Sequence, residues 1–337
     1  MLKDYIRRVV DREDLDEPSA AGAMRVIMSG QATDAQIAAF LVAMRLKGET
    51  VPEITGFARV MREMATRVAA PDDVVDTCGT GGDRSSTFNI STAAALVAAG
   101  MGVRVAKHGN RAVSSSSGSA DVLKELGVNV DAEVDVVARC IEGAGIGFLF
   151  APRLHKAMKF AVGPRREMGI RTVFNILGPL TNPAGAKRQL LGIYDAALTE
   201  TIASVLANLG AVRALVVHGE DGLDEITITG NTKVTELGDG GIRTFTLAPE
   251  DLRLKRAELD SIRVSSPAEG ARAVREVLSG VKGPKRDVVL ANAAAVALVA
   301  GVVKDLVAGV AAAAESIDSG RAAAALERLV KISTAAT

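Results

Sequence analysis

The chain has 337 residues, 48% of them hydrophobic, and its 40 lysines and arginines balance its 40 aspartates and glutamates. This length allows one large domain or two, and the charge balance leaves no basic excess to attract nucleic acid or a membrane surface. Two cysteines, three scattered histidines and a charged amino terminus provide no disulfide framework, zinc site or signal peptide, so we expect a cytoplasmic protein.

Residues 1–70 have a helical pattern throughout. Apolar side chains near the amino terminus recur every three or four positions, and Pro71 marks the end of the pattern. Start signals for later helices stand at Ser19, Thr33 and Pro52. We predict a small helical domain over 1–70. Helices within 153–185, interrupted at Gly163-Pro164, are expected to join it.

From residue 74 onward, short β-branched runs alternate with helical segments. This alternation predicts an α/β domain over 74–337, with a mostly parallel sheet flanked by helices. The expected strands are 74–75, 103–109, 147–150, 211–219, 226–228 and the start of 288–301, and the expected helices include 91–99, 120–126 and 199–209. Ligands of such sheets gather at the carboxyl ends of the strands.

A glycine loop follows the first of these strands. Gly79, Gly81 and Gly82 lie within four residues, and glycine lets backbone N–H groups approach an anion. Ser91 and Thr92 stand where a helix N-cap or a phosphate ligand would be. The spacing matches neither the dinucleotide fingerprint nor the P-loop. We predict a phosphate-binding loop of another type; the alternative is a glycine turn without a ligand.

Two further motifs follow expected strands. Lys107 opens a Gly-Asn turn and a serine-rich stretch, which suits a second phosphate loop, although a solvated basic turn has the same composition. Asp224 and Glu225 are adjacent in a loop, and Mg²⁺ takes one or two carboxylates together with phosphates and waters. A solvated acidic turn is the alternative for this pair.

Arginines gather in the segment after Gly163. Arg165, Arg166 and Arg171 each carry a planar guanidinium that can bind a carboxylate through two hydrogen bonds. Surface or structural ion pairs are the alternative for any one of them.

These motifs together resemble the anthranilate phosphoribosyltransferase family of tryptophan biosynthesis. The resemblance covers most of the chain from Val74 to Gly301, in family order. Its pieces are DTCGTGGD, FNIST, KHGNR, SGSADVL, GVNV, RREMGIRTVFNILGPLTNPAG, VVHGEDGLDEI and NAAAVALVAG. Two positions depart from the family pattern. Ser116 replaces a usual basic residue, which we expect to loosen pyrophosphate contacts, and Lys156 replaces a frequent proline at the substrate entrance.

The resemblance implies an enzyme that joins the amine of anthranilate to the ribose of phosphoribosyl pyrophosphate (PRPP), with Mg²⁺ as cofactor. It also implies a homodimer formed through the helical domain. The residues implied for PRPP are Gly79, Gly82, Asp83, Thr87, Asn89, Ile90, Ser91, Thr92, Lys107, His108, Gly109, Asn110, Arg111, Ala112, Val113, Ser114, Ser115 and Ser119. Those implied for anthranilate are Gly79, Asn110 and Arg165, and those implied for Mg²⁺ are Ser91, Asp224 and Glu225.

No general base is assigned from the sequence. The reaction passes through an oxocarbenium-like sugar, and a neutral aryl amine needs placing more than deprotonating. His108 and His155 are candidates only. Two other functions stay open here, a pyrimidine nucleoside phosphorylase of related architecture and a non-catalytic phosphate- or nucleotide-binding module. The first should lack RREMGIRT, and the second would leave Arg165 and the acidic pair without a role.

Overall fold

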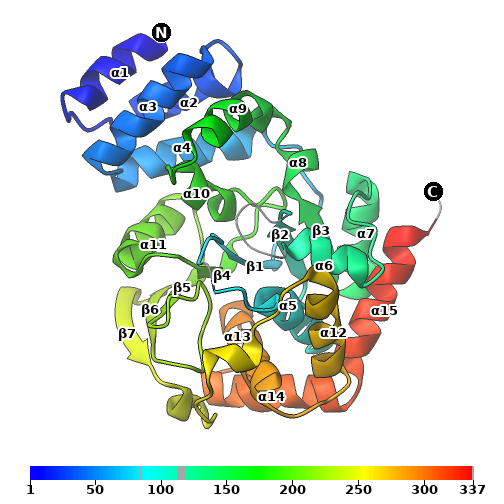
Figure 1. The fold of residues 1–337 in the computed structure, drawn as a ribbon. Coiled ribbons are helices and arrows are strands. Elements are labelled where there is room, and N and C mark those ends of the chain that lie inside the picture. The colour runs from blue at the N-terminus through cyan, green and yellow to red at the C-terminus, as the bar shows by residue number, and fades with distance from the viewer. Residues whose placement is uncertain (84, 112–117, 336–337) are drawn as a thin grey trace.

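The amino-terminal part of the chain consists of four helices. A computed structural model describes residues 1–83, 85–111 and 118–335 (Figure 1). The helices are α1 Leu2–Val10, α2 Glu17–Met28, α3 Asp34–Lys47 and α4 Val51–Met64. The expected start at Ser19 is wrong by two residues, because the Asp16 side chain accepts from Ser19 N and caps the helix earlier. Thr33 caps α3 as the sequence predicts.

The segment after the third strand returns to these amino-terminal helices. It forms α8 Ala151–Leu154, η1 Lys156–Met158, α9 Lys159–Met168, α10 Phe174–Leu177 and η2 Gly178–Leu180. The predicted break at Gly163-Pro164 is wrong, since α9 continues through Pro164 while Ala161 is buried against the amino-terminal helices. In Figure 1, α9 lies beside α3, and the contacts of α9 with α2 and α3 agree with that view. The division into domains at residues 70 and 74 stays a prediction.

A seven-stranded sheet forms the centre of the molecule. Its order is β3-β2-β1-β4-β5-β6-β7, and the first five strands of that order are parallel. The last two pair antiparallel at one edge. The strands are β1 Val75–Gly79, β2 Val105–Gly109, β3 Ile146–Phe150, β4 Arg188–Gly192, β5 Arg213–Gly219, β6 Thr232–Gly238 and β7 Gly241–Leu247. The predicted mostly parallel sheet is confirmed.

Two expected strands are absent from the described residues. Residues 226–228 are irregular. Residues 288–301 contain no strand, because the helix α13, Pro284–Ala300, covers almost all of them. Pro284 lies in the first turn of this helix, and Gly301 caps its end in the left-handed conformation. Conversely, β4, β6 and β7 were not expected. Within the described residues, no helix combines the length and apolar character that crossing a membrane requires.

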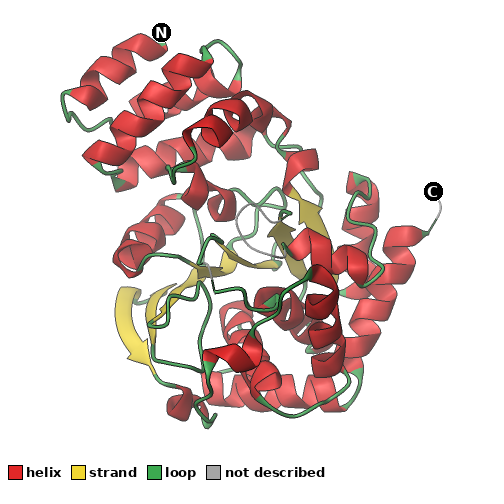
Figure 2. Cartoon of the chain, viewed as in Figure 1, coloured by secondary structure: helices red, strands yellow, loops and turns green. Residues whose placement is uncertain are grey.

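Helices cover both faces of the sheet, as Figure 2 shows by colour. On β4, Leu190 packs into the core that holds α5 and α13, whereas its neighbour Leu191 packs into the core shared with α11 and the amino-terminal helices. This alternation is the period of two expected of a strand buried on both faces. The remaining helices are α5 Ile90–Gly100, α6 Ser119–Glu125, α7 Val134–Ala144, η3 Ala196–Leu198, α11 Thr199–Asn208, η4 Pro249–Leu252, η5 Leu259–Ile262, α12 Pro267–Leu278, α14 Leu306–Asp318 and α15 Arg321–Thr334.

Candidate active site

The glycine loop lies against the acidic loop at the carboxyl ends of β1 and β4. Gly79 and Gly192 end these strands and are paired in the sheet register. A Cβ on Gly79 would lie 2.1 Å from Asp224 Oδ2, and one on Gly192 would lie 1.5 Å from Asp224 O. Gly192 therefore needs glycine, because the Asp224 backbone passes directly over it, whereas a Cβ on Gly79 would displace the Asp224 carboxylate.

Two backbone hydrogen bonds join the acidic pair to the first motif. Gly81 N donates to Asp224 Oδ2 at 2.7 Å, and Ser91 N donates to Glu225 Oε1 at 3.1 Å. Gly81 and Gly82 have φ of +68° and +77°, in the left-handed region that favours glycine. The structure thus brings together two motifs that are more than a hundred residues apart in the sequence.

Both carboxyls of this pair have a raised pKa. Burial raises the pKa of Asp224, and the nearby Asp83 carboxylate raises it further. Burial also raises the pKa of Glu225, with Asp224 as the next cause. Asp224 is buried and Glu225 half-buried, and two such neighbouring groups of like charge favour a cation beside them. Within the described residues, no cluster of three or more His, Cys, Asp or Glu side chains could hold a metal ion.

Lys107 of β2 reaches the place where the glycine loop meets the acidic loop. Its side chain is only 1% exposed, and its Nζ donates to Thr77 O at 2.7 Å and to Ser91 Oγ at 3.1 Å. Burial lowers the pKa of Lys107, while Asp76, Glu225 and other neighbouring groups oppose that shift. The end of β2 therefore carries its ammonium to the same place as the glycine loop and the acidic pair.

The remaining phosphate-loop residues lie around this centre. Asn89 occupies the N-cap of α5, so the expectation that Ser91 or Thr92 caps the helix is wrong; both lie in its first turn, as does Ile90. Ser85 Oγ donates to Asp83 Oδ2 and lies 3.4 Å from Thr87 Oγ1. Ala112, Val113, Ser114, Ser115 and the departure at Ser116 lie outside the described residues.

The turn after β2 is held together locally. Asn110 Oδ1 accepts from Arg111 N at 2.7 Å, and Ser119 Oγ donates to Asn110 O at 3.3 Å. A Cβ on Gly109 would lie 2.4 Å from Ser119 Oγ, so the start of α6 packs closely on the end of β2.

His108 and His155 form a buried pair beside this turn. Their ring centres are 5.1 Å apart, and Nε2 of each has no hydrogen-bond partner among the residues that the structure describes. Burial lowers the pKa of His108 to about 3 and that of His155 to about 4. Both rings are therefore neutral near pH 7, and neither is poised as a base.

The three arginines of the RREMGIRT segment have different surroundings. Arg165 stacks on Phe174, with 5.1 Å from its guanidinium carbon to the ring centre, and burial lowers its pKa. It makes no ion pair within the part of the chain that the structure describes. Arg166 is exposed. Arg171 donates to Gly82 O and stacks on Tyr194 at 4.1 Å.

Sequence reasoning did not assign Arg171 or Asn292 to the site. Arg171 was one of three equivalent arginines, and only the fold brings it against the glycine loop. Asn292, in α13, hydrogen bonds to the backbone beside Glu225. The sequence feature that could have identified Asn292 is its polar amide within an otherwise apolar run, because a buried amide needs hydrogen-bond partners.

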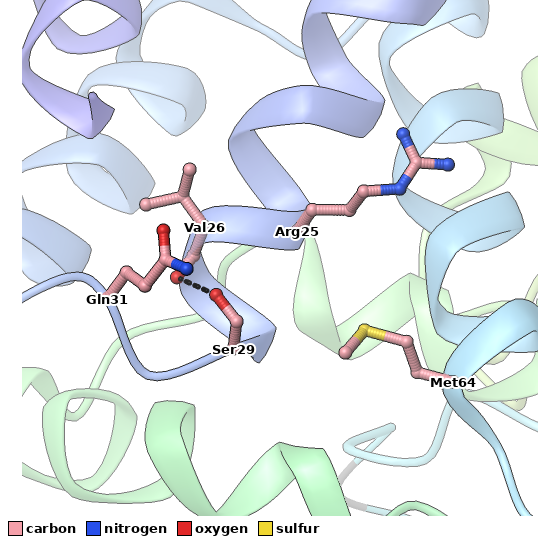
Figure 3. A pocket seen from close by; sticks show the side chains of 5 residues that line it. All are labelled: Arg25, Val26, Ser29, Gln31 and Met64. Carbon is pink, nitrogen blue, oxygen red and sulfur yellow. Dashed lines mark hydrogen bonds between the residues drawn. The ribbon is translucent and has the colours of Figure 1, made fainter.

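A hollow between α2 and α4 lies elsewhere. It is lined by Arg25, Val26, Ser29, Gln31 and Met64 (Figure 3). None of these five belongs to the predicted site.

Comparison with known proteins places the chain in a family. The model described as "Glycosyl transferase family, helical bundle domain" matches residues 3–65, and "Glycosyl transferase family, a/b domain" matches 71–323. Anthranilate phosphoribosyltransferase of Moorella thermoacetica is 59% identical over 331 residues, which is 98% of each chain. The chain belongs to the anthranilate phosphoribosyltransferase family. The family member of Geotalea uraniireducens is 54% identical, with 98% of this chain and 99% of that one covered.

Solved structures of anthranilate phosphoribosyltransferases have the same fold. The Thermus thermophilus enzyme matches with a TM-score of 0.93 and 44% identity, over 98% of this chain and 99% of that chain. The Saccharomyces cerevisiae enzyme in complex with PRPP and Mg matches with a TM-score of 0.90 and 30% identity, over 99% and 98%. The resemblance drawn from the sequence motifs is confirmed.

Proposed function

We propose that this chain transfers the phosphoribosyl group of PRPP to the amine of anthranilate, as a pentosyltransferase of tryptophan biosynthesis. A C–N bond forms at the anomeric carbon, the bond to pyrophosphate breaks, and the amine loses a proton. The observation that carries the proposal is the junction of the glycine loop with the acidic loop, through the bonds from Gly81 N to Asp224 and from Ser91 N to Glu225. Backbone donors, an ammonium and paired carboxylates meet there at strand ends.

PRPP is assigned to the glycine loop and the turn after β2. The first turn of α5 offers N–H groups and the positive end of a helix dipole to a phosphate. Lys107 adds a buried ammonium at the same edge of the sheet. The assigned residues that the structure describes are Gly79, Gly82, Asp83, Thr87, Asn89, Ile90, Ser91, Thr92, Lys107, His108, Gly109, Asn110, Arg111 and Ser119.

Mg²⁺ is assigned to Ser91, Asp224 and Glu225. The repulsion between the two neighbouring carboxyls supports this assignment, because a divalent cation would relieve it. Two carboxylates and a hydroxyl leave room for the phosphate and water ligands that Mg²⁺ prefers. When bound, the ion would offset the charge that builds on the departing pyrophosphate. Lys107 and the loop amides would stabilise the same charge.

Anthranilate is assigned to the side of the site formed by Gly79, Asn110 and Arg165. Arg165 is partly buried and makes no ion pair within the described residues, so its guanidinium is available for the carboxylate. The Nε2 atoms of His108 and His155 are buried and have no partner within the described chain. The low pKa of both rings argues against either of them acting as the base that deprotonates the amine.

The protein is also proposed to be cytoplasmic and to form a homodimer through its amino-terminal helices. The family resemblance supports these two statements. Light scattering of the purified protein tests the oligomeric state.

One assay separates the proposed activity from the two alternatives. Protein, PRPP, Mg²⁺ and anthranilate are mixed, and the loss of anthranilate fluorescence is followed. A transferase consumes anthranilate only when PRPP is present. A nucleoside phosphorylase would instead consume a pyrimidine nucleoside with phosphate, and a binding module would consume neither.

The Arg165→Ala variant tests the anthranilate assignment. We expect its KM for anthranilate to rise about tenfold to a hundredfold, since a bidentate charged contact contributes about 1.5–3 kcal/mol. PRPP binding should hardly change. Arg165→Lys should restore only part of the affinity, because an ammonium keeps the charge and loses the planar fork. Steady-state kinetics with each substrate varied in turn, and a direct PRPP titration, measure both effects.

Arg166→Ala is the matched control, since Arg166 is the exposed neighbour of Arg165 on α9. Equal losses for both substrates in Arg165→Ala would indicate a packing role through Phe174. A larger anthranilate effect in Arg166→Ala would show that the assignment fell on the wrong arginine.

A further inference from the structure

The loop that carries the acidic pair has no sheet pairing of its own. It runs from the end of β5 at Gly219 to the start of β6 at Thr232, without helix or strand between them. Its two carboxylates accept hydrogen bonds from Gly81 N in the glycine loop and Ser91 N in α5. Each of those bonds occupies one oxygen of its carboxylate, Oδ2 of Asp224 and Oε1 of Glu225, and a bound cation would compete with the two N–H donors for the same carboxylates.

One side chain of α13 binds the backbone of this loop. Asn292 of α13 is fully buried, and its Oδ1 accepts from Ile226 N at 3.0 Å. Its Nδ2 donates to Ile226 O at 2.8 Å and to Val288 O at 2.9 Å. Both backbone polar groups of the residue that follows Glu225 are therefore satisfied by a single amide. Such a clamp fixes the backbone without touching either carboxylate.

A second side chain fastens the loop along its length. Asp221 Oδ1 accepts from Leu223 N at 3.1 Å, and its Oδ2 accepts from the hydroxyls of Thr227 and Thr229. Asp221 thus links Leu223, which precedes the acidic pair, to Thr227 and Thr229, which follow it. Together with Asn292, it holds the loop on both sides of Asp224 and Glu225.

We propose that Asn292 and Asp221 are positioning residues that set the Asp224 and Glu225 carboxylates for Mg²⁺. The proposal rests on the proposed function, in which this pair binds the metal of the PRPP complex. Mg²⁺ demands near-ideal octahedral geometry, so its protein ligands must stand at fixed positions. Two like charges on an unpaired loop would otherwise move apart.

The Asn292→Ala variant tests the proposal. We expect the Mg²⁺ concentration for half-maximal turnover to rise about tenfold to a hundredfold, the range typical when a partner of a metal ligand is lost. Calorimetric PRPP binding should weaken at limiting Mg²⁺ and recover in part at high Mg²⁺. The KM for anthranilate, measured at saturating Mg²⁺ and PRPP, should stay the same. Asp221→Asn, on the less buried side of the loop, should shift the Mg²⁺ requirement in the same direction.

Ser316→Ala controls for the loss of a buried hydrogen bond elsewhere. Ser316 is fully buried in α14, and its Oγ donates to Val97 O at 2.8 Å. This variant should lower the melting temperature and leave the Mg²⁺ requirement unchanged. An equal rise in the Mg²⁺ requirement in Ser316→Ala would overturn the proposal, because the effect would then follow general stability.

Different results would overturn the metal assignment and the positioning role. If the unmodified protein turns over anthranilate without Mg²⁺, the metal assignment of the proposed function is wrong. If the unmodified protein needs Mg²⁺ but a folded Asn292→Ala or Asp221→Asn variant shows an unchanged half-saturation, only the positioning role is wrong. Asp221→Asn keeps this second test available if Asn292→Ala does not fold.

Discussion

An Asp224→Ala, Glu225→Ala double variant is expected to lose turnover by about a hundredfold to a thousandfold, the loss seen when a preorganised stabiliser of transition-state charge is removed. Its remaining activity should need much more Mg²⁺. The reason is that the pair supplies both carboxylates of the proposed metal site, and both already lie against the glycine loop and α5. The measurement is an Mg²⁺ titration of anthranilate fluorescence loss at saturating PRPP.

The fold of this double variant should survive. Burial raises the pKa of both carboxyls, the Asp83 charge raises that of Asp224 further, and Asp224 raises that of Glu225, so the ionised forms destabilise the metal-free protein and their removal relieves that cost. Asp72→Ala with Asp73→Ala is a matched control, because these adjacent carboxylates are exposed and Asp73 makes only a surface ion pair with Arg104. If the double variant needs the same Mg²⁺ concentration for half-maximal turnover as the unmodified protein, the metal assignment is wrong.

The sequence predicted four of the five parallel strands because their signals are local, whereas β4 was not expected. β1, β2, β3 and β5 contain or follow short apolar or β-branched runs next to glycine or helix signals, and the alternation of strands with helices orders them along the chain. β6 and β7 mix polar and apolar residues, and β7 is largely exposed, so neither has a clear hydrophobic pattern. The start of 288–301 resembled a buried strand, and periodicity alone cannot separate a buried strand from a buried helix.

The sequence predicted the types of residue in the candidate site, but it did not predict which of them are in contact. Strand ends of a parallel sheet meet at one edge, so the glycine loop, Lys107 and the acidic pair could be expected near one another. That Gly192 is needed beneath Asp224, and that Arg171 rather than Arg165 contacts the glycine loop, depends on long-range packing. No local pattern carries that information, since the contacting residues are far apart in the chain.

A Gly79→Val variant is expected to lose PRPP affinity by about a hundredfold or more, equivalent to about 2.7 kcal/mol, while keeping its fold. A Cβ at this position would lie 2.1 Å from Asp224 Oδ2, the end of a side chain that can turn away. Gly192 does not offer this test, because its Cβ would meet the Asp224 backbone at 1.5 Å and force the chain itself to move. Calorimetry with PRPP and Mg²⁺ measures the affinity, and circular dichroism checks the fold.

The matched control for Gly79→Val is Gly240→Val, between β6 and β7. A Cβ on Gly240 would meet no heavy atom within 4 Å, so a valine there adds the same bulk away from the site. PRPP affinity should be unchanged in this variant. Gly79→Ala should lie between the two, because its single methyl group displaces the Asp224 carboxylate without filling the loop. Normal PRPP affinity in a well-folded Gly79→Val protein would mean that the glycine loop is a structural turn, and that Lys107 and the N-terminus of α5 hold the phosphates without it.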